Sequence, residues 1–307
     1  HYPLRRQRQM CIRDRPRSAT NLRVGLIQQK NTESLEINFE RTVNKINELA
    51  AKGVQVICLQ ELFLSLYFCA NHEEQNFDLA EPIPGLTTDI LSELAKKNNV
   101  VLIASLFEHR TKGIYHNSTV VIDADGKYLG KYRKVHIPED PGFHEKYYFT
   151  PGDENYQVFH TAYGKLGILT CWDQWFPEPA RIMALKGADI LFYPTAIGWE
   201  LGTNQEVNQE EYDAWQTVQR GHAVANGIPV VSVNRVGIEE GTNFWGGSFA
   251  CNAFGKLLYQ ASHVDDASYY VDIDLMDTER YRRRWPFLRD RRIDTYQPIL
   301  QRYIEEK

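Results

Sequence analysis

Residues 22–63 read LRVGLIQQKNTESLEINFERTVNKINELAAKGVQVICLQELF and predict a strand–helix–strand unit. LRVGLIQ and VQVICLQ are short apolar runs of the kind found in buried strands. Between them, apolar residues recur at helical spacing: Phe39, Val43, Ile46, Leu49 and Ala50. Gly53 is placed to end this helix. A unit of this kind favours a largely parallel sheet.

The same alternation continues along the chain and predicts a single α/β domain. Residues 86–98 predict a second helix and residues 100–107 a third strand. Residues 115–134 differ, because two extended stretches flank Asp125-Gly126, a dipeptide typical of hairpins. Further strands and helices are predicted at 165–170, 179–187, 189–194, 212–227 and 228–234, and antiparallel strands at 248–261 and 268–274. This mixture predicts mixed β-sheets with helices on the outside.

The composition is that of a globular protein and argues against several other classes. Hydrophobic residues make up 43% of the chain and charged residues 24%, so a sizeable core can form. A net charge of -5 provides no general attraction for nucleic acid. No run of eighteen apolar residues occurs, so we expect no membrane partner. No apolar signal stretch begins the sequence, which favours a cytoplasmic protein.

The cysteines are odd in number and widely scattered: Cys11, Cys58, Cys69, Cys171 and Cys251. No C-x-x-C pair occurs, so the sequence indicates neither a disulfide framework nor a zinc site. Reduced thiols fit a cytoplasmic protein.

Two arginine-rich segments lie toward the ends of the sequence. Residues 1–20 show no hydrophobic periodicity, and we interpret them as a disordered or non-native tail. Residues 279–292, ERYRRRWPFLRDRR, interleave arginines with aromatic residues, as some nucleic-acid-binding segments do. Because acidic residues are interspersed and the whole chain is acidic, we expect no nucleic-acid partner.

Cys171 is the first candidate catalytic residue. It follows the predicted strand 165–170 within ILTCWDQWFPE (168–178), at the strand end where open α/β sheets bind ligands. Pro177 suits the first turn of the next helix, and backbone N–H groups there would stabilise a thiolate. The alternative is a buried, inert cysteine.

Glu61 and Lys134 are the next candidates. Glu61 follows the second predicted strand between apolar neighbours, so burial could raise its pKa toward that of a useful general base. Lys134 closes the predicted hairpin and precedes the extended Val-His-Ile-Pro stretch. Taken alone, each also fits a surface residue.

Taken together, Glu-Leu-Phe at Glu61, Lys-Val-His-Ile-Pro at Lys134 and Cys-Trp-Asp at Cys171 resemble the Glu-Lys-Cys triad of the nitrilase superfamily of carbon–nitrogen hydrolases. A further carboxylate of that family matches Glu145 in HEKYYFTPGD. The resemblance covers roughly residues 21–306. It implies a four-layer α-β-β-α sandwich, one domain over 21–307 with a C-terminal oligomerisation extension, a homo-oligomer, and no metal or cofactor.

The resemblance also implies a mechanism. Glu61 would take the proton of Cys171, whose thiolate would attack the substrate carbonyl. Lys134 and the Trp172 backbone N–H would stabilise the developing oxyanion. Glu145 would keep Lys134 charged and oriented.

Three further stretches, at 172–200, 214–237 and 244–249, resemble the branch of the superfamily that acts on N-carbamoylputrescine. This resemblance implies a ureido substrate with a cationic tail. A cation favours carboxylates and aromatic faces near the pocket mouth. The candidate substrate-binding residues near the motifs are Trp172, Trp199, Glu200 and Asp140.

Other functions stay open at this point. The enzyme could act on another small linear amide or on an N-carbamoyl amino acid, and an acidic or basic pocket mouth would separate these substrates. A catalytically silent scaffold on the same fold would not need the four matching residues. A serine hydrolase is not supported, because GGSFA around Ser248 lacks the trailing glycine of G-x-S-x-G. We therefore interpret the remaining histidines near the motifs as structural or pocket-lining: His136, His144 and His222.

Overall fold

The computed structural model describes residues 21–305, so the predicted tail at 1–20 lies outside the described residues. A first six-stranded sheet has the order β15-β1-β2-β3-β4-β5. Strands β1, β2 and β3 are parallel, and β15, β4 and β5 extend the sheet in antiparallel pairings. The strands are β1 (Asn21–Gln28), β2 (Val56–Leu59), β3 (Val101–Thr111), β4 (Ile114–Ile122), β5 (Tyr128–Arg133) and β15 (Ala267–Asp274).

A second six-stranded sheet repeats this plan with the order β14-β13-β10-β8-β7-β6. Strands β10, β8 and β7 are parallel, and the flanking pairings are antiparallel. The strands are β6 (Val158–Thr161), β7 (Gly164–Ile168), β8 (Ile190–Pro194), β10 (Val230–Val233), β13 (Phe249–Cys251) and β14 (Leu257–Gln260).

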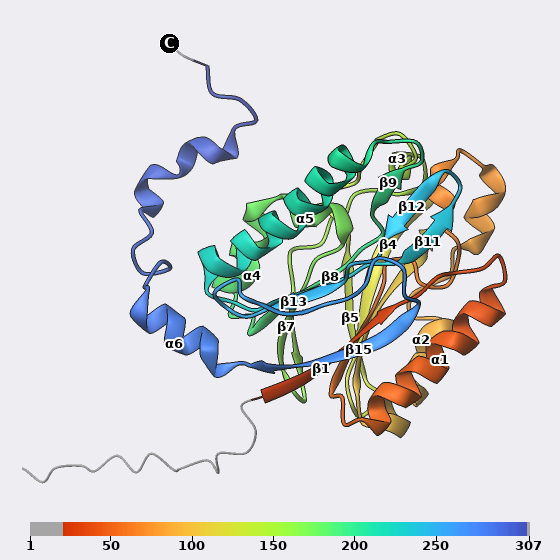
Figure 1. Cartoon of the computed structure of the whole chain (residues 1–307), viewed down its shortest axis with the longest axis horizontal. Coiled ribbons are helices and arrows are strands. Elements are labelled where there is room, and N and C mark those ends of the chain that lie inside the picture. The colour runs from red at the N-terminus through yellow and green to blue at the C-terminus, as the bar shows by residue number, and fades with distance from the viewer. Residues whose placement is uncertain (1–20, 306–307) are drawn as a thin grey trace, which may run out of the picture.

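The two sheets lie between two pairs of helices (Figure 1). Helices α1 (Leu35–Ala51) and α2 (Leu86–Asn98) cover the first sheet, and α4 (Pro177–Leu185) and α5 (Gln205–Asn226) cover the second. The predicted four-layer α-β-β-α sandwich is therefore confirmed, and α2 has the predicted bounds.

The alternation of side chains along β2 explains why the sheets stack this way. Val56 and Cys58 belong to the core cluster that joins both sheets, whereas Ile57 and Leu59 belong to the cluster that includes α1 and α2. Successive strand residues point to opposite faces, so an unbroken apolar run must be covered on both sides.

Several short elements complete the fold. A three-stranded sheet, not predicted from the sequence, has the order β11-β12-β9. Its strands are β9 (Gly198–Glu200), β11 (Val236–Glu239) and β12 (Thr242–Trp245). The short helices are η1 (Phe68–Ala70), η2 (Glu74–Leu79), α3 (Glu145–Tyr148), η3 (Cys171–Trp175), α6 (Met276–Arg284), η4 (Ile293–Thr295) and η5 (Gln297–Leu300). None of the helices within residues 21–305 is long and apolar enough to cross a membrane.

Candidate active site

The candidate catalytic side chains come from the ends of three strands. Glu61 follows β2, Lys134 follows β5 and Cys171 follows β7. Two hydrogen bonds hold the sheets together beside them. The hydroxyls of Thr119 and Thr170 lie 2.9 Å apart, and the Glu61 backbone N–H donates to the Thr195 carbonyl at 3.3 Å. Residues far apart in the sequence thus meet at one edge of the sandwich.

The structure brings all four predicted residues of the catalytic group together in a buried cluster. The Lys134 Nζ lies 2.8 Å from Glu61 Oε1 and 2.6 Å from Glu145 Oε2. One carboxylate oxygen of Glu61, one of Glu145 and the Cys171 Sγ all lie within 4.8 Å of one another. All four side chains are almost completely buried.

The two oxygens of the Glu61 carboxylate have different surroundings. Oε1 accepts hydrogen bonds from Lys134 and from Asn117 Nδ2, the latter at 2.7 Å. Oε2 is buried and has no hydrogen-bond partner among the described residues. Since a buried acceptor without a partner is costly, this oxygen is available to accept a proton from a nearby group.

Lys134 carries its charge inside the protein. Burial would lower its pKa, but Cys171 whenever its sulfur is ionised, and the carboxylates of Glu145 and Glu61, outweigh this effect and hold the pKa well above its usual range. An ammonium group has three N–H donors, and two of them serve Glu61 and Glu145. The third has no partner within residues 21–305, so it can serve an oxygen of a bound substrate.

Glu145 differs from an ordinary surface glutamate. Burial raises its pKa to about 7, despite the opposing effect of the Lys134 charge. Its second oxygen accepts a hydrogen bond of 2.7 Å from the Tyr67 hydroxyl. The carboxylate is therefore fixed by two donors from different segments.

Cys171 lies on a strained turn rather than at the start of an α-helix. It begins the short helix η3, and α4 begins only at Pro177. Its φ of 41° is unusual for a residue other than glycine. Burial and then Glu61 raise the pKa of the thiol, so the expectation of a thiolate stabilised by the α-helix is wrong. A neutral thiol needs a base.

Asp173 fixes this turn, and sequence reasoning missed it. One of its carboxylate oxygens accepts from the Thr170 backbone N–H at 3.0 Å and from the Tyr132 hydroxyl at 2.7 Å. The other accepts from the His136 backbone N–H at 3.0 Å. Asp173 therefore joins the cysteine turn to the segment that carries Lys134.

Arg235 supports the Glu61 segment in a similar way. Its buried guanidinium donates to the carbonyl oxygens of Glu61 and Leu62, both at 3.0 Å, and pairs with Glu239 at 2.8 Å. Leu62 has a φ of 48°, so this contact stabilises a second strained backbone position. Arg235 directly follows the predicted strand 228–234, just as Glu61 and Cys171 follow predicted strands. This position could have indicated that Arg235 lies near the active site.

A pocket of about 380 Å³ opens next to Cys171. Of the four predicted substrate-binding residues, Trp172, Glu200 and Asp140 line it. Glu211, on α5, also lines it and was not predicted. Burial and the neighbouring Glu200 raise the pKa of Glu211.

The structure does not place Trp199 in this pocket. Its indole N–H donates to the Asn208 carbonyl at 2.7 Å, and its ring packs on Trp245 at 5.4 Å. Trp199 alternates with Gly198 and Glu200 along β9, and neighbouring residues of a strand face opposite sides. This residue packs against the core instead.

The other histidines have structural contacts. His136 Nδ1 lies 2.7 Å from Asp173, and its ring stacks on Phe176 at 3.8 Å. His222 Nε2 lies 2.8 Å from the Gln174 carbonyl. The two histidines therefore stabilise η3 and Phe176, the residue that follows it.

Comparisons with known proteins identify similar sequences and a similar solved structure. The model of the carbon–nitrogen hydrolase family matches residues 23–283. The chain is 42% identical to the N-carbamoylputrescine amidase of Solanum lycopersicum, over 90% of this chain and 94% of that protein. It is 40% identical to the citrullinase of Francisella tularensis, over 92% of this chain and 99% of that protein. The crystal structure of a carbon–nitrogen hydrolase from Helicobacter pylori G27 has a TM-score of 0.89 and 48% identity, covering 92% of this chain and 100% of that one.

Proposed function

The chain belongs to the carbon–nitrogen hydrolase family, and from that premise we propose that it hydrolyses N-carbamoylputrescine to putrescine, ammonia and carbon dioxide. Cys171 is the nucleophile, Glu61 the general base and acid, Lys134 the oxyanion donor and Glu145 a positioning residue. The observation that carries the substrate assignment is the acidic pocket beside the buried thiol.

The first half of the reaction forms a thioester. The free Oε2 of Glu61 accepts the thiol proton while Sγ attacks the ureido carbon. The third N–H of Lys134 and the Trp172 backbone N–H donate to the oxyanion. The first N–H groups of a helix have no partner within it, and each such donor contributes on the order of 3 kcal/mol. Glu61 then donates the thiol proton to the departing amide nitrogen as the C–N bond breaks, so ammonia leaves and an S-carbamoyl cysteine remains.

The second half returns the enzyme to its starting state. Glu61 takes a proton from water, and the resulting hydroxide attacks the thioester carbon. The thiol is released with that proton, and the product carbamate loses carbon dioxide to give the amine. All proton transfers use groups already in the buried cluster.

The pocket selects the tail of the substrate. Among the described residues, its lining includes three acids, Asp140, Glu200 and Glu211, and no lysine, arginine or histidine. Trp172, Trp175 and Trp245 add aromatic surface. Carboxylates and aromatic faces both attract an ammonium group, whereas the carboxylate of an N-carbamoyl amino acid would be repelled. The pocket therefore favours the amine-bearing substrate over N-carbamoyl amino acids.

We expect Glu200→Gln and Glu211→Gln each to raise the KM for N-carbamoylputrescine about tenfold or more with little change in kcat. Each substitution removes a charged hydrogen-bond acceptor worth about 1.5–3 kcal/mol. The substrate and the transition state lose the same binding energy, because the contact is to the tail, so KM rises and kcat stays nearly constant. Ammonia release measured over a substrate series gives both constants.

Two controls separate charge recognition from damage to the fold. Butylurea has the ureido group without the distal amine, so its turnover should change little in either variant. Glu210→Gln changes the neighbouring residue of α5, which does not line the pocket. If the parent protein hydrolyses only N-carbamoyl amino acids, the mechanism stands and the substrate proposal is wrong.

Glu145→Gln should lower kcat about a hundredfold and remove part of the pH dependence. Because the Glu145 pKa is about 7, its carboxylate becomes charged as the pH rises through 7, which strengthens its hold on Lys134. The parent kcat/KM should therefore rise across this range, and the variant should show a smaller rise. Tyr67→Phe removes the hydrogen bond to Glu145 but keeps the Glu145 carboxylate, so it should lower kcat less. An unaltered rate in Glu145→Gln would contradict this role.

We also propose that the C-terminal arm, residues 276–305, joins two copies of the chain. The part of the arm after α6 leaves the sandwich (Figure 1). It exposes large apolar side chains, including Ile293, Ile299, Leu300 and Tyr303, which are 63–78% exposed. Such a surface is unfavourable in a free monomer and suits a subunit contact.

Replacing Ile299 and Leu300 together by serine should therefore shift the protein from an oligomer toward a monomer. Light scattering of the protein as it elutes from a size-exclusion column measures the molar mass of the assembly. A paired change of Lys96 and Lys97 on the exposed side of α2 to serine serves as the control. A monomeric parent protein would refute the proposal.

A further inference from the structure

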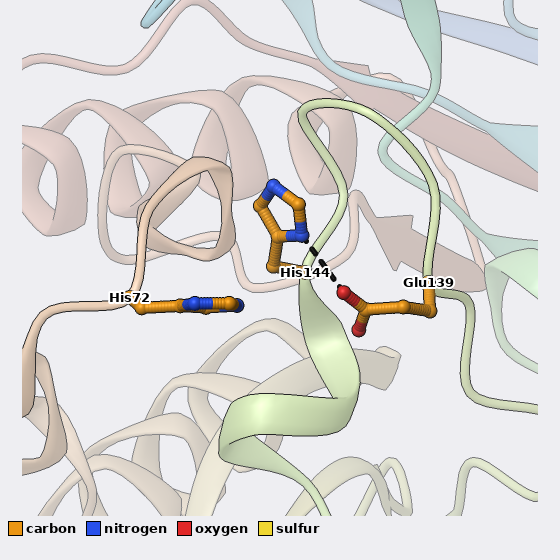
Figure 2. A group of neighbouring side chains, drawn as sticks. All are labelled: His72, Glu139 and His144. Carbon is orange, nitrogen blue, oxygen red and sulfur yellow. Dashed lines mark hydrogen bonds and ion pairs between the residues drawn. The ribbon is translucent and has the colours of Figure 1, made fainter.

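Three side chains of types that can bind a metal ion lie together outside the buried cluster. They are His72, Glu139 and His144 (Figure 2). One ligand atom from each lies within 4.8 Å of those of the other two. His72 and Glu139 are exposed, and His144 is about one third exposed. The catalytic cycle proposed above uses none of them.

A tight turn holds two of these residues side by side. Asp140 and Phe143 pair through backbone hydrogen bonds of 3.2 and 2.8 Å. Glu139 and His144 directly flank this pair, so their side chains emerge next to each other. The His144 Nδ1 lies 2.8 Å from a Glu139 carboxylate oxygen (Figure 2).

The segment of His72 is fixed against the same turn. The His144 backbone N–H donates to the Cys69 carbonyl at 2.8 Å. The Tyr148 hydroxyl donates to the Asn71 carbonyl at 2.5 Å and accepts from the Glu73 backbone N–H at 2.9 Å. Backbone atoms on both sides of His72 are therefore held close to the turn that carries Glu139 and His144.

Among the described residues, the nitrogens of the His72 ring are free to bind an ion. It lies 4.7 Å from the His144 ring and 4.7 Å from the Tyr147 ring, measured between centroids. Within residues 21–305, no hydrogen bond engages its nitrogens. Ligand atoms around one tetrahedral zinc ion lie about 3.4 Å apart, given metal–ligand distances of about 2.0–2.1 Å. Exposed side chains can close this gap by small rotations.

We propose that His72, Glu139 and His144 bind a divalent transition-metal ion of the zinc class, with water completing the shell. Two imidazoles and one carboxylate suit zinc, cobalt or nickel rather than calcium or magnesium, which prefer oxygen ligands. The cysteine spacing predicts no zinc site, and this ligand set is assembled from segments about 70 residues apart in the sequence.

The ion would act on the wall of the active-site pocket. Pro138, Asp140, Pro141 and Phe143 line that pocket from the segment that carries Glu139 and His144. A bound ion would join this wall to the segment that follows η1. Asp140 is also one of the three acids that face the substrate tail, so the metal site and the specificity pocket share one loop.

The test is a zinc titration of the full chain after treatment with a chelator, in a Cys171→Ala background. This background removes the thiol of the other candidate cluster, Glu61, Glu145 and Cys171. We expect binding at one site that His72→Gln and Glu139→Gln each weaken at least about tenfold. His160→Gln removes an exposed histidine elsewhere and should leave this binding unchanged.

Two spectroscopic readouts complete the test. Cobalt should give the visible absorption of tetrahedral coordination in the background protein and lose it in His72→Gln. Zinc should slow hydrogen exchange of the amides of residues 139–144 in the background protein and not in His72→Gln. Equal zinc affinity in the background protein, His72→Gln and Glu139→Gln would overturn the proposal.

Discussion

Replacing Cys171 by alanine should lower the rate of ammonia release from N-carbamoylputrescine by at least about 10⁵-fold. Without the sulfur there is no thioester, and the remaining oxyanion donors give only weak residual catalysis; losing the nucleophile of a comparable catalytic group costs about 10⁶-fold. The measurement is ammonia release by the purified variant beside the parent protein.

A matched control distinguishes loss of the nucleophile from loss of the fold. Cys251 is also a buried free thiol, but it lies in β13 within the core. Cys251→Ala should retain most of the activity, although it removes the same atom. Intact-mass measurement on the parent protein during turnover should reveal the S-carbamoyl adduct. More than about one per cent of parent activity in Cys171→Ala would rule out a cysteine nucleophile.

Glu61→Gln should lower kcat about 10³-fold or more. General base catalysis contributes about 10²–10⁴-fold per step, and Glu61 serves in both halves of the reaction. Because burial raises the pKa of the Cys171 thiol, the sulfur cannot rely on a preformed thiolate. The glutamine amide keeps the size of the side chain but cannot take the proton.

Thiol reactivity separates loss of the base from damage to the nucleophile. Alkylation of Cys171 by iodoacetamide at neutral pH should be at least as fast in Glu61→Gln as in the parent protein, because the charge of Glu61 raises the pKa of the thiol and the thiolate is the reactive form. Glu93→Gln changes an exposed carboxylate on α2 and should alter neither rate. Unchanged turnover in Glu61→Gln would assign the proton transfer to another group.

The buried charges explain why supporting residues matter as much as the four central ones. Lys134 is placed by two carboxylates, the turn of Cys171 by Asp173, and the strained Leu62 by Arg235. A buried charge is tolerated only when paired and hydrogen-bonded. Each supporting group therefore holds a catalytic side chain or the backbone that carries it in place.

The sequence by itself determined the repeated part of the fold and the residues of the central cluster. The strands and helices of the sandwich follow from apolar periodicity, as the helix at 86–98 illustrates. Glu61 and Cys171 each come just past a predicted strand, at the end where α/β sheets bind ligands. Their grouping with Lys134 and Glu145 rests on the resemblance to the Glu-Lys-Cys triad, because Lys134 taken alone also fits a surface residue.

Only the tertiary structure decided what surrounds them. The three-stranded sheet is built from strands of three or four residues, too short for a clear periodic signal. Glu211 reaches the pocket from α5, and Trp199 turns away from it because of its place on β9. The raised thiol pKa of Cys171 depends on burial and on charges distant in sequence. Local pattern specifies secondary structure, whereas pocket charge, desolvation and side-chain direction arise only when distant segments pack together.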